Sequence, residues 1–148
     1  MNNPPVALPY ISIVVTGREL ADLYRKRAAL FSERAVLASE EATAYAARAK
    51  DQDALVERGF GPAPLAGLRP GQDRDAAIAA YRERVASDVA LRLAGIHAQA
   101  EEFRRSAAAL AFMADHLEPD EDYRVADMTI DRLLGPISGT PPWPLGVP

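Results

Sequence analysis

A long stretch free of helix-breaking residues constrains this chain more than any other sequence feature. Between Gly17 and Gly59 there is no other glycine and no proline, the two residues least compatible with a helix interior. Thr16 and Glu19 at its start have the spacing of a capping box, in which each side chain accepts a hydrogen bond from the other residue's N–H. Gly59 favours a helix end, because glycine adopts the left-handed conformation readily. The spacing predicts one continuous helix over residues 17–58.

A second stretch of the same kind follows a loop rich in glycine and proline, residues 59–72. Asp73 is a suitable N-cap, and from there to Leu117 the chain contains no proline and one glycine. We therefore expect a second helix over residues 73–117. Both helices are much longer than the average of about 11–12 residues in globular proteins. Two such helices joined by a loop predict an αα-hairpin.

The helices carry complementary seven-residue patterns. Alternating steps of three and four keep one stripe of a helix facing a partner helix. Small residues on one stripe opposite large residues on the other allow close antiparallel packing. The pattern predicts an all-α fold, a long antiparallel helical hairpin with a coiled-coil-like, alanine-rich seam, and its register places Ala28 near Phe103 and Ala21 near Leu110. The alanine stripe of the first helix is Ala21, Ala28, Ala35, Ala42 and Ala49.

A second apolar row on the first helix is offset from the alanine stripe. Its leucines, Leu23, Leu30 and Leu37, are also spaced by seven. Because two packed helices cover only one seam, this row needs a further covering element. The candidates are the C-terminal third of the chain, a second copy, or a different protein.

The C-terminal region, residues 118–148, differs from the rest in composition. It opens on an acidic turn and continues with a short helix over residues 127–134, for which Asp127 is a candidate cap and Gly135-Pro136 a stop signal. The proline-rich tail that follows favours an extended, polyproline-like conformation suited to docking in a groove. Its candidate contact residues are Trp143, Pro144 and Leu145.

The N-terminal segment, residues 1–15, is also rich in proline, and its second half is apolar and β-prone. One isolated strand leaves its backbone groups unpaired. Packing as extended chain against the hairpin is the expectation here, and pairing with a strand of another chain is the alternative. The predicted organisation is thus an extended N-terminal segment, a hairpin over residues 16–117, and the C-terminal region.

Catalytic and metal-binding patterns are weak in this sequence. The chain has no cysteine, which removes thiolate ligands and cysteine nucleophiles. His97 and Glu101 share a helix face, but this spacing alone does not make a metal centre. The acidic residues from Asp120 to Asp122 lack the glycine and twelfth-position glutamate of an EF-hand loop. We therefore predict no catalytic, cofactor-binding or metal-binding residues.

Composition narrows the classes of function further. The net charge of −4 over 148 residues does not suit a nucleic-acid binder, and no apolar run approaches the roughly 18 residues of a membrane span. We expect a cytoplasmic, non-catalytic interaction protein, structural subunit or adaptor of a larger assembly, bound to a protein partner or to further copies. One alternative is a small helical-bundle enzyme or ligand-binding protein with a site between copies, using His97 and Glu101. Another is a regulatory nucleic-acid binder using the basic residues 25–27. The predicted partner-binding residues are Leu23, Leu30, Leu37, Trp143, Pro144 and Leu145.

Overall fold

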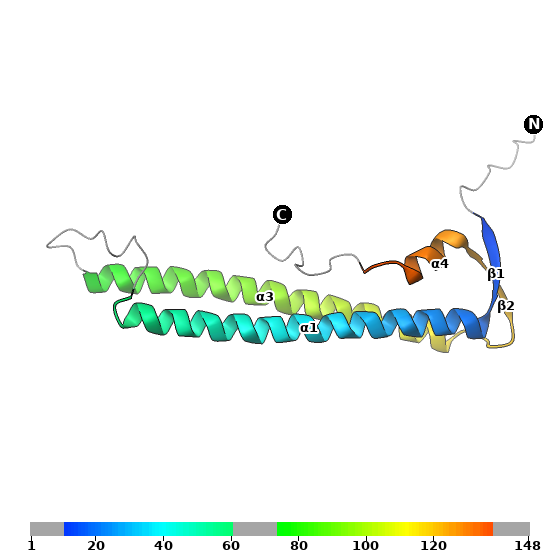
Figure 1. The fold of residues 1–148 in the computed structure, drawn as a ribbon, viewed down its shortest axis with the longest axis horizontal. Helices are drawn as coiled ribbons and strands as arrows, with labels where there is room; N and C mark the ends of the chain where they lie inside the picture. The colour runs from blue at the N-terminus through cyan, green and yellow to red at the C-terminus, as the bar shows by residue number, and fades with distance from the viewer. Residues whose placement is uncertain (1–10, 61–73, 138–148) are drawn as a thin grey trace, which may run out of the picture. The chain divides into compact units, whose positions relative to one another are not determined.

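The fold was taken from a computed structural model, which describes residues 11–60 and 74–137. Two long helices pack against each other, so the predicted helical hairpin is confirmed, and a short third helix follows (Figure 1). A small two-stranded sheet is added to this helical fold. In chain order the elements are β1 (Ser12–Thr16), α1 (Gly17–Glu57), α3 (Arg74–Asp115), β2 (Asp122–Ala126) and α4 (Asp127–Leu134).

Local chemistry fixes both ends of α1. The Thr16 N–H donates to Glu19 Oε2 at 3.0 Å, and the Glu19 N–H donates to Thr16 Oγ1 at 3.1 Å, which confirms the capping box. At the other end Gly59 has a φ of +97°. The Gly59 N–H donates to the Val56 carbonyl and the Phe60 N–H to the Leu55 carbonyl, which is the Schellman arrangement.

The alanine stripe of α1 lies in the interior, as its spacing predicts. Ala21, Ala28, Ala35 and Ala42 are buried, and Ala49 is half-buried. The facing stripe of α3 supplies larger buried residues, among them Ile96 and Phe103, together with further alanines. Small side chains on one helix thus meet larger ones on the other, as expected of closely packed helices.

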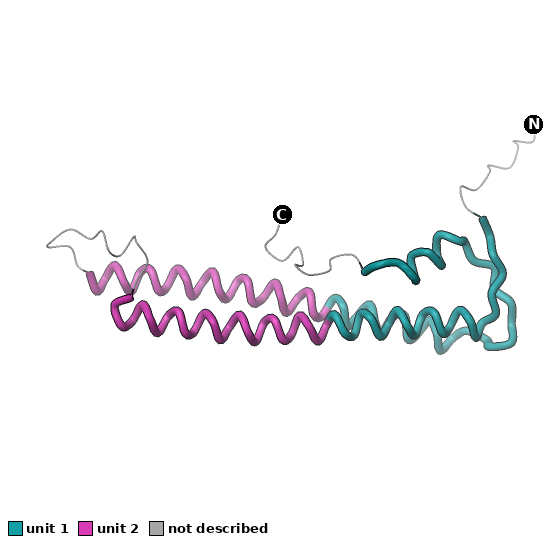
Figure 2. Tube along the Cα trace, viewed as in Figure 1, with its two compact units in different colours: residues 1–34, 102–140 teal, residues 35–101, 141–148 magenta. Residues whose placement is uncertain are grey.

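The chain divides into two compact units (Figure 2). Unit 1 is formed by residues 1–34 and 102–140, and unit 2 by residues 35–101 and 141–148. Each unit therefore contains one part of α1 and one part of α3. Unit 1 also holds both strands and α4.

Unit 1 has a core built from several elements. Leu20, Ala21, Tyr24 and Ala114 form its buried cluster. The Phe31 and Phe103 rings lie 6.0 Å apart between centroids, within the range of a favourable aromatic pair. Half-buried residues from the sheet, from α3 and the turn after it, and from α4 pack against the cluster: Val15, Leu110, Leu117, Tyr123, Val125, Ile130 and Leu133. Ala21 and Leu110 thus lie in one cluster, in agreement with the expected register.

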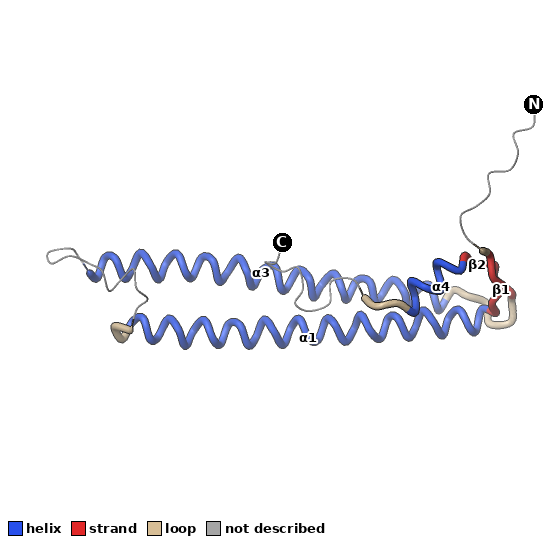
Figure 3. The backbone as a smooth tube through the Cα atoms, turned by 45° about the horizontal axis from the view of Figure 1, so that its top comes forward, coloured by secondary structure: helices blue, strands red, loops and turns tan. Residues whose placement is uncertain are grey.

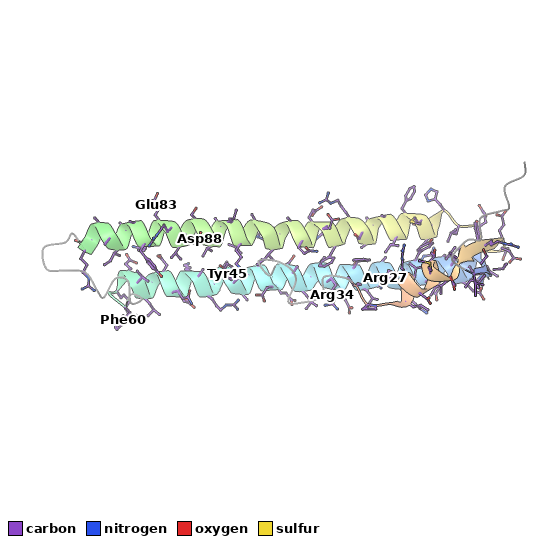
Figure 4. The ribbon with its side chains drawn as sticks, turned by 90° about the horizontal axis from the view of Figure 1, so that it is seen from above. Arg27, Arg34, Tyr45, Phe60, Glu83 and Asp88 are labelled. Atoms are coloured by element: carbon purple, nitrogen blue, oxygen red, sulfur yellow. The ribbon has the colours of Figure 1, made fainter. Side chains whose placement is uncertain are left out.

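The most buried residues of unit 2 are alanines, with Ala38 fully buried and Ala42 and Ala100 nearly so. Polar contacts between α1 and α3 add to this packing. Asp53 of α1 pairs with Arg82 of α3, and the Arg92 guanidinium lies 5.7 Å from the centre of the Tyr45 ring, which Figure 4 labels.

The N-terminal apolar segment forms a strand, so the expectation that it packs as extended chain against the hairpin is wrong. β1 pairs antiparallel with β2, with Val14 opposite Arg124 and Ser12 opposite Ala126 (Figure 3). Pairing satisfies backbone groups that extended packing would leave without partners. β2 alternates exposed and half-buried residues, the period-two pattern of a strand with one covered face. The second half of the predicted acidic turn is therefore strand.

The third helix, α4, covers the predicted residues 127–134, but Asp127 is not its N-cap. Its N-cap is Ala126, which offers no side-chain cap, and Asp127 Oδ1 instead accepts a hydrogen bond from the Met128 N–H at 2.7 Å. At the end, the Gly135 N–H donates to the Asp131 carbonyl. The two proline-rich termini that the sequence predicts to be extended fall outside the described residues. No helix in the described ranges combines the length and hydropathy needed to cross a membrane.

Candidate functional site

The leucine row on α1 is only partly covered. Leu23 is half-buried, whereas Leu30 is 44% exposed and Leu37 is 46% exposed. In the sequence the three leucines recur at an interval of seven, the periodicity of one helix face. The structure therefore leaves two of the three predicted contact leucines accessible to a partner. Trp143, Pro144 and Leu145, the other predicted contact residues, lie outside the described residues.

Arg27 anchors the segment after α4 to α1. Only 9% of this residue is exposed. Its guanidinium donates hydrogen bonds to the carbonyl oxygens of Gly135 and Pro136 and lies 5.4 Å from the centre of the Phe31 ring. Figure 4 labels Arg27 on the part of α1 beside which α4 lies. Since Ile137 is also buried, the chain is held against unit 1 up to the last described residue.

The basic stretch of α1 is engaged within unit 1. Arg25 pairs with Asp115 at 3.3 Å, and Lys26 pairs with Asp22 at 3.0 Å. Arg27 is the third member of the stretch and holds the two carbonyls described above. Arg18, about two turns before Arg25, lies 3.6 Å from Asp120 of the acidic turn. The acidic turn thus meets Arg18 of α1 in the same chain.

The residues considered for metal binding are dispersed. His97 and Glu101 are exposed on α3. Among the residues that the structure describes, no group of three or more histidine, aspartate or glutamate side chains is close enough to hold a metal ion. The ring of His116 lies at the end of α3, with Nδ1 2.8 Å from the Phe112 carbonyl oxygen, where a histidine satisfies a free helix-end carbonyl.

Sequence reasoning did not identify a groove between α1 and α3 in unit 2. It encloses about 310 Å³, and an ion pair lies at its wall. The available signal was the density of alanine at these helical positions, because small side chains leave space along a seam where larger ones would fill it. The groove is lined by Ala46, Ala49, Lys50, Asp53, Arg82, Val85, Ala86, Val89, Ala90 and Leu93.

The Asp53–Arg82 ion pair at this groove is bidentate. Arg82 Nε donates to Asp53 Oδ1 at 2.7 Å, and Arg82 Nη2 donates to Oδ2 at 2.8 Å. These hydrogen bonds lower the pKa of Asp53 below its ordinary value and raise the pKa of Arg82. Glu57 Oε2 lies 3.9 Å from Arg82 Nη2. Because the pair is accessible to water, it adds little to the stability of the fold. Its two parallel hydrogen bonds instead fix how α1 and α3 meet at this point.

Comparison with protein-family models, curated proteins and solved structures finds no match to this chain.

Proposed function

We propose that this protein is a non-catalytic interaction protein or structural subunit that binds another protein through the leucine row of α1. The observation that carries the proposal is the exposure of Leu30 and Leu37, at 44% and 46%. Single exposed apolar residues are ordinary on protein surfaces. Here two leucines recur at an interval of seven on one helix, which is the spacing of anchor residues when a helix face meets a partner. The cytoplasmic location expected from the sequence is part of the proposal.

Burial energetics support a partner for these side chains. Complete burial of a leucine side chain is worth about 1.5–3 kcal/mol relative to full exposure. Leu30 and Leu37 reach only part of this stabilisation within the chain, since nearly half of each remains accessible. A partner that covers both would gain the remainder and would exclude water from the face. The neighbouring Val36 is 56% exposed and would add apolar area at the edge of such a contact.

The C-terminal tail is the second element of the proposal. Arg27 and the buried Ile137 hold the chain against unit 1 where the described residues end. The last described residue is therefore held on the same unit as Leu30. A proline-rich segment loses little conformational entropy on binding. Trp143, Pro144 and Leu145 are the residues proposed to contact the partner.

The test is quantitative affinity capture with the full-length tagged protein in the cells that produce it. Leu30→Gln and Leu37→Gln keep side-chain length and helix propensity but remove apolar character. Each is expected to reduce the recovery of a bound protein by about tenfold or more, as for an interface anchor. Ser32→Gln is the matched control, because Ser32 is exposed on α1 outside the row. Equal recovery with all variants would contradict the proposal.

A further inference from the structure

The outer edge of β1 presents unpaired backbone groups. In the antiparallel ladder, the Asp127 N–H donates to the Ile11 carbonyl and the Gly17 N–H donates to the Glu121 carbonyl. Hydrogen-bonded pairs alternate along such a ladder, so Ile13 and Val15 also direct their backbone groups toward β2. The N–H and C=O groups of the intervening residues, Ser12 and Val14, therefore point away from β2.

Nothing in the described part of the chain pairs with this edge. β1 has β2 as its only partner strand there, and Ser12 and Val14 have no other hydrogen bond. Thr16 differs, because its N–H is bound by the Glu19 carboxylate. Within residues 11–60 and 74–137, the open part of the edge is thus a short segment with two free donors and two free acceptors. Val14 at its centre is 58% exposed.

The two edges of the sheet differ in chemistry. Charged residues on an edge strand are a common protection against pairing with another chain. The free edge of β2 carries Asp122 and Arg124, whereas β1 contains no charged residue. A two-stranded sheet is also only marginally stable by itself and gains stability from further strands. The unprotected edge of β1 is therefore the one suited to accept a strand.

We propose that the edge of β1 pairs with β1 of a second copy of this chain, antiparallel about a two-fold axis at Ile13. In this register Ser12 lies opposite Val14 of the second copy and Val14 opposite its Ser12. Each pair forms two hydrogen bonds, so all free N–H and C=O groups of both segments are used. Ile13 faces its own counterpart in a non-hydrogen-bonded pair, where side chains approach most closely.

Self-complementarity favours a second copy as the occupant. The open segment has the same number of donors and acceptors in an arrangement that a two-fold axis maps onto itself, and a two-fold interface uses one patch twice. No charge opposes the approach of two β1 edges. The contact produces a four-stranded sheet, β2–β1–β1–β2, with the charged edges outside. This surface is separate from the leucine row, so the inference does not depend on the proposed function.

The test is sedimentation equilibrium of the full-length protein, with two matched proline variants. Val14→Pro removes an outward N–H and blocks the β1 edge without removing a bond to β2. Arg124→Pro makes the same change on the β2 edge, because Val14 and Arg124 are opposite each other in the ladder. We expect a concentration-dependent dimer for the unmodified protein and for Arg124→Pro. Self-association of Val14→Pro is expected to be at least about thirtyfold weaker, because two of the four hydrogen bonds are lost.

Two further variants separate loss of pairing from loss of folding. Val14→Lys keeps the backbone N–H but places two positive charges near the two-fold axis, and we expect it to weaken the dimer while the helical circular dichroism is unchanged. Ile13→Cys, in a chain that otherwise has no cysteine, is expected to form a disulfide-linked dimer on oxidation. A monomeric unmodified protein would overturn the inference. Equal association of Val14→Pro and Arg124→Pro, or a dimer that Leu30→Gln abolishes, would overturn it as well.

Discussion

The two units use the same pair of helices but stabilise them differently. In unit 1 the strands and α4 pack on the helices, and large residues such as Leu20, Tyr24 and Phe103 are buried. Among the described residues of unit 2, α1 and α3 form the interior, and most of the buried residues are alanines. Several large residues of unit 2 stay at the surface, as with Leu91 at 77% exposure, although Ile96 is buried. The two-helix seam of unit 2 thus buries mostly small side chains, and the strands and α4 of unit 1 accompany the burial of more large ones.

This difference also separates the surfaces available for binding. In unit 1, α4 and the Arg27 contacts cover part of the α1 surface, while Leu30 remains accessible. In unit 2, Leu37 is exposed on α1, and the alanine positions leave the groove beside the Asp53–Arg82 pair. Four substitutions test whether the stability of unit 1 depends on the strands and α4, and whether that of unit 2 depends on the contacts between α1 and α3.

The largest effect is expected from Phe103→Ala in unit 1. Phe103 is buried and packs against Phe31, so truncation removes apolar burial and leaves a cavity. The free energy of unfolding should fall by about 3–5 kcal/mol, measured by urea denaturation. Leu91→Ala in unit 2 is the control, and because Leu91 is mostly exposed it should change stability by less than about 0.5 kcal/mol. Similar losses for both variants would remove the contrast between the units.

Gly17→Ala should have the next largest effect. An added Cβ would lie 1.8 Å from the Glu118 carbonyl oxygen and 2.7 Å from its carbon. Backbone atoms cannot move aside as a flexible side chain can, so a loss of about 3 kcal/mol is expected in urea denaturation. Gly59→Ala in unit 2 meets no atom within 4 Å but has a φ of +97°, and it should cost only about 1 kcal/mol. A larger loss at Gly59 would contradict this ranking.

Arg27→Met tests the attachment of the segment after α4. The substitution keeps an unbranched apolar stem but removes the hydrogen bonds to Gly135 and Pro136. We expect a loss of about 2 kcal/mol, because two partly buried hydrogen bonds from a charged donor are lost. Hydrogen exchange should show faster exchange in α4 and at Ile137, with α1 of unit 2 unchanged. Exchange that is equally fast throughout α1 would show that Arg27 supports the whole hairpin instead.

The smallest effect is expected from Asp53→Asn in unit 2. Arg82 lowers the pKa of Asp53 below its ordinary value of 3.8, so the ion pair stabilises the folded state above that pH. The contribution is lost as the pH falls through the lowered pKa of the folded state. The unmodified protein should therefore melt slightly higher than Asp53→Asn at pH 7, by less than about 2 °C. This difference should shrink below pH 3.8, and a difference that grows on acidification would contradict the assignment.

Local signals in the sequence predicted much of this fold. The capping box at Thr16, the Schellman end at Gly59 and the stop at Gly135 each depend on a few neighbouring residues. The pairing of β1 with β2 could not be predicted in this way, because it joins residues more than one hundred positions apart. The acidic run from Asp120 to Asp122 favoured a solvated turn at the place where β2 begins.

The candidate site was predictable only in part. The spacing of the leucines indicated a second face on α1, but only the fold shows that Leu30 and Leu37 remain accessible whereas Leu23 is half-buried. Arg27 was considered together with Arg25 and Lys26 as one basic surface. Since successive residues of a helix project about 100° apart, these three side chains point in different directions, and of the three only Arg27 is buried.

The most direct test of the leucine face is photo-cross-linking in the cells that produce the protein. A photoreactive amino acid is placed at position 30 or 37, and at Glu33 as an exposed control on α1. The account predicts cross-links from positions 30 and 37 to the same second polypeptide, with little product from position 33. Equal yields at all three positions, or cross-links only within one chain, would contradict the claim that this face binds another protein.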